Sequence, residues 1–422
     1  MDKFSRPTGT QDLLPAEQPY WEYVTSSAAA TARRFGYERI ETPIFEATGL
    51  FARGVGGATD IVEKEMYSFR DKGDHALTLR PEFTAGVVRA YIENGLHTLP
   101  KPVKLFSLGP IFRYERPQAG RFRQFHQFNA EIFGIQDPLA DLETMLLAWD
   151  LYAGWDFKGL AFQLNSTGCP VCRPTFSTAL RDYYQSHLHE ICEDCKRRLE
   201  TNPLRVLDCK QERCQPVIAG APQSIAHLCE ECSTHFTSLR SYLDALGRPY
   251  TINPRLVRGL DYYTKTVFEV WAEGIGAQAA VCGGGRYDGL IELLGGRPTP
   301  AVGFAAGLER IILVMKAQGL TPPALPVPPV FIAFSGDAAR ATAVRLVVDL
   351  RAAAIGAQIA MGGSLKAQLR QADKAQARFV FIIGEDELAR GEVNFKDMAT
   401  GTQLTVALDT AAAQVSQALA AC

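Results

Sequence analysis

The chain has 422 residues, of which 47% are apolar and 21% charged, and this composition excludes a disordered or fibrous protein. Its 44 basic and 46 acidic residues leave a net charge of −2, so a nucleic-acid partner would need a local basic patch rather than bulk charge. No apolar run reaches the roughly 18 residues that span a bilayer, and Met1–Pro7 lacks the apolar core of a signal peptide. At roughly 150 residues per domain, we expect about two to four domains in a cytoplasmic protein without a membrane partner.

The N-terminal region predicts a helix followed by a short strand. Apolar residues recur at helical spacing over 17–35, and Gly36 ends the helix. A strand over 37–40 must stop before Pro43, because proline cannot donate a hydrogen bond to a strand ladder.

Between residues 103 and 133 the apolar period changes to two, which predicts a long antiparallel hairpin with one polar face. Ile111, Arg113 and Glu115 would share a face of the first strand. The stretch 116–122 is rich in turn residues. Alternation on the second strand separates an apolar set from a polar set, which are Phe128, Ala130 and Ile132 against Gln127, Asn129 and Glu131.

Eight of the ten cysteines lie in a stretch with helical segments near 174–200 and 222–246, which suggests an inserted helical subdomain over 166–247. Without a secretory signal, disulfides are disfavoured. Four close pairs suit two Cys₄ structural zinc sites, but reduced buried thiols fit equally well. The pairs are Cys169/Cys172, Cys192/Cys195, Cys209/Cys214 and Cys229/Cys232.

The remaining segments predict more strands and then a separate α/β domain. Strands are expected at 262–271, 277–282 and 301–304, with helices at 287–295 and 305–318. A proline-rich linker follows at 321–328. Beyond it, strands and helices alternate, which favours a small domain with a mainly parallel sheet. Its first five elements are expected at 330–334, 338–354, 358–361, 365–374 and 379–383.

Four features could carry chemistry, and each has a plain structural alternative. Residues 113–123 contain four arginines and one glutamate, which suits phosphate recognition or a solvated basic hairpin. Arg258 could form an ion pair with Asp261 or bind an anion. The glycines of Gly283–Gly289 would let a ligand approach the backbone, although glycine-rich turns are common. Arg310, early in a predicted helix, could reach a ligand or lie at the surface.

In this order and spacing, these segments resemble the histidyl-tRNA synthetases, a family of class II aminoacyl-tRNA synthetases, over nearly the whole chain. The family's opening segments are matched by Arg6–Asp12 and Thr78–Glu82. The helix, strand and Pro43 resemble the first class motif, residues 112–127 the second and 307–310 the third. The two histidine-specific motifs are matched by Arg258–Tyr263 and Gly283–Gly289.

The resemblance implies an α+β catalytic core with an antiparallel six-stranded sheet, a helical insertion and a C-terminal α/β anticodon-binding domain. The first class motif implies a homodimer. The boundaries we expect are 1–165 and 248–320 for the core, 166–247 for the insertion, 321–328 for the linker and 329–422 for the anticodon-binding domain.

The implied activity is that of a histidine–tRNA ligase. It would convert L-histidine and ATP, with Mg²⁺, to histidyl-adenylate and pyrophosphate, and then transfer histidine to the 3′-terminal adenosine of histidine tRNA. Matching positions imply that Arg258 and Arg113 are catalytic. The ATP-binding positions are Arg113, Glu115, Arg121, Phe125 and Arg310.

The histidine- and tRNA-binding positions also follow from the resemblance. Arg116 and Gln118, on the hairpin turn, match the loop that contacts the tRNA acceptor end. Phe83 stands where many relatives have glycine, and we expect its side chain to point away from the amine site. The implied histidine-binding residues are Glu82, Phe83, Thr84, Arg113, Gln127, Glu131, Arg258, Tyr262 and Tyr263.

Two other functions compete with this one. The first is a non-catalytic, synthetase-like regulatory subunit of the ATP phosphoribosyltransferase of histidine biosynthesis. Such proteins lack the C-terminal domain and lose catalytic residues, whereas Arg113, Arg258, Arg310 and residues 329–422 are all present here. The second is an RNA-binding module, which would have no histidine-shaped pocket.

Overall fold

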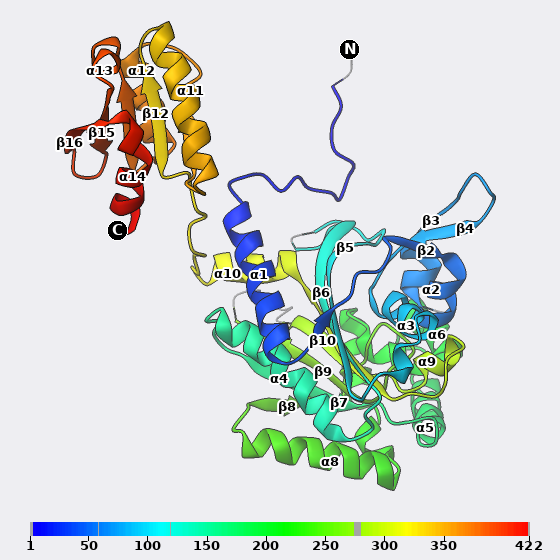
Figure 1. Cartoon of the computed structure of the whole chain (residues 1–422). Coiled ribbons are helices and arrows are strands. Elements are labelled where there is room, and N and C mark those ends of the chain that lie inside the picture. Colours follow the sequence, from blue (N-terminus) through cyan, green and yellow to red (C-terminus); the bar gives the residue numbers. More distant parts are fainter. Residues whose placement is uncertain (1–2, 58, 119, 274–279, 421–422) are drawn as a thin grey trace. The chain divides into compact units, whose positions relative to one another are not determined.

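The chain divides into two compact units, Met1–Pro323 and Ala324–Cys422. Each unit has its own sheet and its own apolar core, and Figure 1 labels their elements. The computed structural model describes residues 3–57, 59–118, 120–273 and 280–420.

An eight-stranded sheet forms the centre of the first unit, in the order β1-β5-β6-β11-β10-β9-β7-β8. Its six central strands are antiparallel to one another, while β1 and β8 pair in parallel with β5 and β7 at the two edges. The sheet thus contains the expected six antiparallel strands and two more. The strands are β1 Glu38–Arg39, β5 Val103–Phe112, β6 Gln124–Phe133, β7 Ala161–Ser166, β8 Tyr250–Ile252, β9 Thr264–Trp271, β10 Ala280–Arg286 and β11 Ala301–Gly307.

Four helices pack on one face of this sheet and enclose the main core. In α1, buried Trp21, Val24 and Ala28 recur at helical spacing, so one stripe of the helix faces the sheet. The first turn of α4 is capped by Asp137, whose carboxylate accepts a hydrogen bond from the backbone N–H of Leu139. The helices are α1 Gln18–Arg34, α4 Pro138–Gly154, α8 Glu230–Ala245 and α10 Leu308–Ala317.

The hairpin of β5 and β6 keeps one register from Val103 opposite Phe133 to Phe112 opposite Gln124. Because β5 ends at Phe112, Arg113 and Glu115 do not share a strand face with Ile111, as the period of two predicted. They lie in the connection, where the Arg113 N–H still donates to the Arg123 carbonyl at 2.9 Å. On β6, Phe128, Ala130 and Ile132 enter the main core as expected.

The glycine run is part of a strand rather than a turn. Gly283, Gly284 and Gly285 lie in the middle of β10 and pair with β9 on one side and β11 on the other. Residues 277–279 of the strand expected at 277–282 lie outside the described residues. The helix expected at 287–295 is only α9 Leu290–Leu293, and the helix expected from residue 305 begins at Leu308, because β11 continues to Gly307.

The cysteine-rich stretch is mostly helical, as expected. A separate small core there contains Phe176, Leu180, Ile191 and Val206. Its last helix, α8, instead joins the main core through Phe236, Leu239 and Leu243. The shorter elements are α5 Arg173–Gln185, α6 Glu193–Thr201, η3 Pro203–Asp208, η4 Glu212–Cys214, α7 Gln215–Ala219 and η5 Ser224–His227.

A small three-stranded sheet, in the order β2-β4-β3, lies before the hairpin in the sequence. Helix α3 follows it and packs with α9 on the other face of the large sheet, within a second core that includes Phe83, Tyr262 and Tyr287. These elements are β2 Phe45–Ala47, α2 Thr48–Val55, η1 Ile61–Glu65, β3 Tyr67–Arg70, β4 Ala76–Leu79, α3 Thr84–Glu93 and η2 Leu96–Thr98.

The second unit is a five-stranded sheet with the order β13-β12-β14-β15-β16. Its first three strands are parallel, but β15 and β16 are antiparallel, so the sheet is mixed rather than mainly parallel. The elements are β12 Val330–Phe334, α11 Asp337–Ala352, β13 Ala357–Ile359, α12 Leu365–Lys374, β14 Phe379–Ile383, α13 Glu385–Ala389, β15 Glu392–Asp397, β16 Gln403–Ala407, η6 Leu408–Thr410 and α14 Ala411–Ala420.

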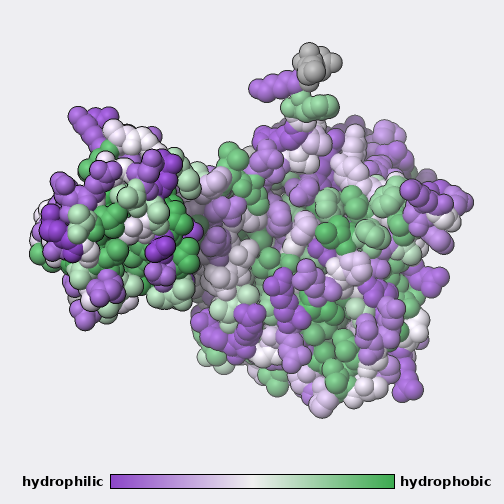
Figure 2. Space-filling model, turned by 45° about the horizontal axis from the view of Figure 1, so that its top comes forward, coloured by the Kyte–Doolittle hydropathy of each residue, from purple (hydrophilic) through white to green (hydrophobic). Residues whose placement is uncertain are grey.

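The visible surface mixes hydrophilic and hydrophobic side chains on both units (Figure 2). Within the described residues, none of the helices has the length and apolar character needed to cross a membrane.

Candidate active site

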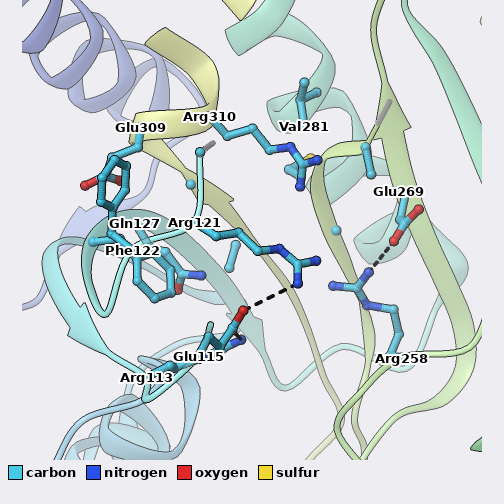
Figure 3. A pocket seen from close by; sticks show the side chains of 17 residues that line it. Arg113, Glu115, Arg121, Phe122, Gln127, Arg258, Glu269, Val281, Glu309 and Arg310 are labelled. Carbon is cyan, nitrogen blue, oxygen red and sulfur yellow. Dashed lines mark hydrogen bonds and ion pairs between the residues drawn. The ribbon is translucent and has the colours of Figure 1, made fainter. Parts of the chain in front are cut away.

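A cavity of about 290 Å³ opens between β6, β10, β11 and the connection that follows β5 (Figure 3). The strands contribute small or flat residues to its floor, among them Phe125, Gly283 and Ala305. Four arginines and three glutamates supply its charge. They are Arg113, Arg121, Arg258, Arg310, Glu115, Glu269 and Glu309.

Positive charge is concentrated inside this cavity. Figure 3 shows Arg121, Arg258 and Arg310 pointing into the same space from three different segments. The pKa of Arg310 is lowered, first by burial and then by the charge of Arg121. Such an arrangement favours an anion that can offset the repulsion, and guanidinium groups suit phosphate oxygens.

Arg258 is held by a partner that the sequence did not indicate. Its Nη1 donates to Oε1 of Glu269 on β9 at 2.7 Å, and the indole N–H of Trp271 donates to the same carboxylate at 2.9 Å. Burial lowers the pKa of Arg258, but Tyr263 and Glu269 outweigh it and the net shift is upward. The alternative ion pair with Asp261 is wrong, because Asp261 lies 3.7 Å from Arg205 instead.

Two glycines of β10 leave the space that the side chains of Arg258 and Tyr263 occupy. A Cβ at Gly283 would lie 2.4 Å from Nη1 of Arg258, and one at Gly285 would lie 2.9 Å from Cδ1 of Tyr263. Both side chains therefore rest directly on the strand backbone. Any larger residue at these two positions would push them away.

Arg113 is anchored through its own side chain. Its Nε donates to the carbonyl of Pro81 at 2.8 Å, and its guanidinium lies 5.8 Å from the ring centroid of Phe125. Glu115 lies 3.8 Å from Arg113 and 3.4 Å from Arg121, so one carboxylate bridges two arginines at the mouth of the cavity.

Glu131 is the centre of a buried polar cluster on the same face of β6. Thr84 Oγ1 donates to its Oε1 at 2.7 Å, Asn129 Nδ2 donates to the same oxygen at 3.1 Å, and the Tyr287 hydroxyl donates to Oε2. Burial raises the pKa of Glu131 to about 7, although these three hydrogen bonds oppose the shift. A carboxylate of this kind can accept or release a proton near neutral pH.

Glu82 and two tyrosines adjoin this cluster. Glu82 accepts hydrogen bonds from the backbone N–H groups of Thr84 and Ala85 at 2.6 and 2.8 Å, and burial raises its pKa. The rings of Tyr262 and Tyr263 lie 4.9 Å apart. Burial is the main cause of the raised pKa of both tyrosines. The charge of Glu82 adds to the shift of Tyr262, whereas Arg258 opposes the shift of Tyr263, so these groups occupy one small space.

The Phe83 side chain belongs to the core rather than to this space. It is 2% exposed and packs among Val87, Tyr91 and their neighbours. The guanidinium of Arg80 lies 4.3 Å from its ring centroid. The backbone of Phe83 still adjoins Glu82 at the start of α3, so only its main chain is available near the polar cluster.

Gln127 lines the arginine cavity, whereas Arg116 and Gln118 are exposed beyond it. Gln118 and Arg121 exchange backbone hydrogen bonds at 3.2 and 2.9 Å, which closes the hairpin turn. The turn therefore presents Arg116 and Gln118 to solvent while its base holds Arg121 at the cavity.

The sequence did not predict the roles of three residues of the site. Glu269 lies in an alternating strand and gave no separate signal. Tyr287 lies within the glycine motif, at the start of the helix expected over 287–295, and nothing in that pattern indicates a site role. Glu309 accepts hydrogen bonds from the His126 N–H at 2.9 Å and pairs with His126 Nδ1 at 3.0 Å, which joins the third class motif to β6. Chain-distant contacts of this kind leave no mark on sequence periodicity.

The eight paired cysteines form two groups that could each hold a metal ion. One contains Cys169, Cys172, Cys229 and Cys232, and the other contains Cys192, Cys195, Cys209 and Cys214.

Comparison with known proteins identifies the family. The family model described as histidyl-tRNA synthetase matches residues 9–170 and 174–311, and the model described as anticodon binding domain matches residues 329–418. The chain is 53% identical over 406 residues to the protein named histidine–tRNA ligase of Pelotomaculum thermopropionicum, covering 96% of each chain. It is 52% identical over 405 residues to the protein of that name from Desulforamulus reducens, covering 96% of this chain and 97% of the other.

Its fold also matches a crystal structure of apo histidyl-tRNA synthetase from S. aureus. The TM-score is 0.83 and the identity is 37%, with 98% of this chain and 99% of the other covered. The chain therefore belongs to the histidyl-tRNA synthetase family.

Proposed function

We propose that this chain is a histidine–tRNA ligase of class II. It activates L-histidine with ATP and then transfers the histidyl group to the 3′-terminal adenosine of histidine tRNA. One observation carries the proposal: an arginine-lined cavity and a buried acid–tyrosine cluster share one face of β6. The first suits a polyphosphate and the second a small polar ligand.

Activation is an attack of a histidine carboxylate oxygen on the α-phosphorus of ATP. The new P–O bond forms as the bond to pyrophosphate breaks, and negative charge grows on the phosphoryl oxygens. We assign Arg113 and Arg258 to the α-phosphate, because fixed positive charge accelerates the reaction most where charge develops. Arg121 and Arg310 take the γ-phosphate, with ATP entering as its magnesium complex.

The adenine ring needs a flat contact and a hydrogen-bonding partner. We assign Phe125 to the first role and Glu115 to the second, since both line the cavity beside Arg113. Glu115 already bridges Arg113 and Arg121, so the same carboxylate orders the phosphate-binding arginines before ATP arrives.

Histidine selection is a matter of hydrogen bonds, because neutral imidazole carries one donor and one acceptor. Glu131 accepts from the ring N–H and the Tyr263 hydroxyl donates to the other nitrogen. Glu82 and Thr84 hold the α-amino group, while Gln127 and Tyr262 complete the pocket. An apolar analogue would leave these buried polar groups unpaired. Its kcat/KM should therefore be about 10⁴-fold or more below that of histidine.

The tRNA contacts come from both units. The exposed turn with Arg116 and Gln118 reaches the acceptor end, where the extra 5′ guanosine of histidine tRNA lies. Residues 329–422 bind the anticodon. We place the protein in the cytoplasm, and the nine free cysteines among the described residues suit that reducing compartment.

A homodimer completes the proposal. The three-stranded sheet exposes an apolar face that includes Phe45 at 53% and Phe69 at 44%, close in sequence to Pro43 of the first class motif. A second copy would cover such a face. Sedimentation velocity at micromolar concentration should give the mass of two chains, and an active monomer would exclude the dimer.

Histidine-dependent ATP–pyrophosphate exchange tests the function directly. The enzyme should incorporate labelled pyrophosphate into ATP only when histidine is present, and phenylalanine should not replace it. A regulatory subunit would show no exchange at all. An RNA-binding module would bind tRNA but would also give no exchange, so either negative result would overturn the proposal.

A further inference from the structure

The two cysteine groups are nested in the chain. The outer site, Cys169, Cys172, Cys229 and Cys232, encloses the whole of the inner site, Cys192, Cys195, Cys209 and Cys214. Within each group all four sulfur atoms lie within 4.8 Å of one another. Two close pairs that are distant in sequence meet in each site, which simple burial of thiols does not require.

The sulfur spacing matches a metal site rather than disulfides. The Sγ atom of Cys172 lies 3.8 Å from those of Cys169 and Cys232, and the same distance separates Cys192 from Cys209. A tetrahedral ion with metal–sulfur bonds of about 2.3 Å sets its ligands about 3.8 Å apart. Disulfide sulfurs would lie about 2.05 Å apart. An iron–sulfur cluster divides its four cysteines between two or more iron atoms, which places some of the sulfurs further from one another.

Backbone groups are arranged to stabilise thiolates at both sites. The Cys169 N–H donates to Cys172 Sγ at 3.2 Å, and the Cys192 N–H donates to Cys214 Sγ at the same distance. Helix α6 begins directly after Cys192 and α8 directly after Cys229, so the helix dipoles add positive potential there. Each helix places its second cysteine in the first turn.

Gly168 lets the chain pass close to the outer site. Its φ is +71°, and a Cβ at this position would lie 2.6 Å from Cys172 Sγ. The conformation and the approach both require glycine. Any other residue at position 168 would displace the Cys172 sulfur from the outer site.

The outer site is also tied to the segment that follows the first histidine-specific motif. The Lys265 N–H donates to the Gly168 carbonyl at 2.9 Å, and the Thr167 N–H donates to the Lys265 carbonyl at 2.8 Å. Arg173, next to Cys172, donates to the carbonyl of Tyr263.

The other half of the outer site holds the same segment. Glu231 lies between Cys229 and Cys232, and its carboxylate pairs with the Lys265 ammonium at 2.7 Å. Lys265 is itself 4% exposed and has a φ of +49°, so the chain bends sharply there. Residues beside both cysteine pairs of the outer site therefore bind the same bend of the chain, directly after Tyr263.

We propose that both groups bind structural zinc, and that the outer zinc holds the Tyr263–Lys265 bend in position for histidine recognition. The second part rests on the proposed function, whereas the first does not. The zinc is a positioning element: it touches no substrate, and its ligands act through Arg173, Lys265 and Glu231.

Metal analysis of the full chain, purified under reducing conditions without chelator, tests the zinc sites. The untouched protein should contain two zinc ions per chain, and Cys172→Ser and Cys209→Ser should each retain one. Cys422→Ser, which alters neither group, should keep both. Absence of zinc from the active wild-type protein, or iron in its place, would overturn the assignment. If a cysteine variant does not fold, cobalt substitution of the wild-type protein should give the absorption of two tetrathiolate sites.

Arg173→Ala tests the positioning role, because it leaves all eight cysteines in place. We expect two zinc ions, a rise of about tenfold in KM for histidine and a change in kcat of less than about threefold in pyrophosphate exchange, since one charge-assisted hydrogen bond is lost. Arg181→Ala, an exposed arginine on the same helix, should change neither constant. An unchanged KM in Arg173→Ala would exclude the positioning role. Failure of exchange in the wild-type protein would instead refute the proposed function and leave the zinc count standing.

Discussion

Arg258 Nη1 lies 2.7 Å from Glu269 Oε1, and this ion pair joins a loop residue to strand β9 in the interior of the large sheet. Glu269 occupies one edge of the guanidinium, and Figure 3 shows a second terminal nitrogen of this group pointing into the cavity. The carboxylate thus fixes the direction of the arginine's charge. A catalytic cation must be fixed before the reaction begins, since reorganisation during the reaction would cost rate.

Arg258→Ala should therefore slow activation severely. A charge that acts mainly in the transition state contributes about 3–4 kcal/mol, so the rate of pyrophosphate exchange should fall by about two to three orders of magnitude, with KM for histidine nearly unchanged. Arg255→Ala, an exposed arginine of the same segment, serves as the control. A decrease smaller than tenfold would mean that Arg258 is not catalytic.

Glu269→Gln should give an intermediate defect. The amide keeps the shape of the side chain but loses the charge that orients Arg258, so we expect kcat to fall by about tenfold. Combined with Arg258→Ala, the second substitution should add little further loss, because both act through the same guanidinium. Fully additive losses in this double-mutant cycle would show that Glu269 acts independently.

Glu131→Gln should make the folded protein more stable than the wild type at and above neutral pH. Below the ordinary pKa of 4.5 the residue is protonated in both folded and unfolded chains; as pH rises to about 7, only the unfolded chain ionises and the native state loses stability. The variant avoids this loss, so its advantage in chemical denaturation should be small at pH 5 and approach about 3 kcal/mol at pH 8.

The same variant should lose histidine discrimination. An ionised Glu131 accepts the imidazole N–H, so kcat/KM for histidine in the wild-type enzyme should rise with pH through about 7. In the Glu131→Gln enzyme, kcat/KM should depend on pH only through the titration of the histidine substrate. An unaltered profile would exclude Glu131 as the imidazole acceptor.

Arg286→Ala should destabilise the fold without any direct effect on the cavity. Arg286 and Asp141 have fully buried side chains, and burial of Asp141 would raise its pKa, but Arg286 and His235 outweigh burial and lower the pKa to about 2. Removing the guanidinium partner of this buried carboxylate should cost about 3–5 kcal/mol above pH 4, and the cost should shrink in acid as the pKa of about 2 is approached. The exposed pair of Arg39 with Glu41 is the control, where Arg39→Ala should change stability by less than about 0.5 kcal/mol.

Gln118→Ala should affect tRNA use alone. Base contacts give roughly 1–3 kcal/mol of discrimination, so aminoacylation of histidine tRNA with the extra 5′ guanosine should fall, and that of a tRNA lacking it should fall much less. Pyrophosphate exchange needs no tRNA and should stay almost unchanged. Aminoacylation should be measured for both enzymes with both tRNAs. If the loss caused by Gln118→Ala and the loss caused by the missing guanosine simply add, this turn does not read the extra nucleotide.

Apolar patterning predicted the elements that meet a core along their whole length. Helix α1 lies close to its expected position because one stripe of it faces the sheet, and strand β12 lies at its expected position because its continuous apolar run is buried on both faces. The same patterning failed at β10, where the glycine run indicated a turn: Gly283–Gly285 form a strand because they pair with β9 and β11, and glycine is needed there because Arg258 and Tyr263 lie against the backbone. Local propensity cannot reveal a neighbour from another segment.

The same limit applies to the site. The arginines could be singled out because charged clusters and motif spacing are visible in a sequence, but their partners could not. Glu269 and Tyr287 acquire their roles from contacts with Arg258 and Glu131, which are 11 and 156 residues away in the chain. Asp261, three positions from Arg258, was the nearer carboxylate and the wrong one.

Strand β6 finally implies that this enzyme tolerates substitutions better than changes of length. Phe125, Gln127 and Glu131 share one face of the strand, which spans about 20 Å between its first and last site residues, while Phe128 and Ala130 fill the core behind it. Deleting one residue from the middle of β6 would turn part of the strand over, exchanging ligand-facing and core-facing side chains along it. A point change alters one position on one face, whereas a change in the residue count between Phe125 and Glu131 alters both faces at once, so that count must stay fixed over evolutionary time.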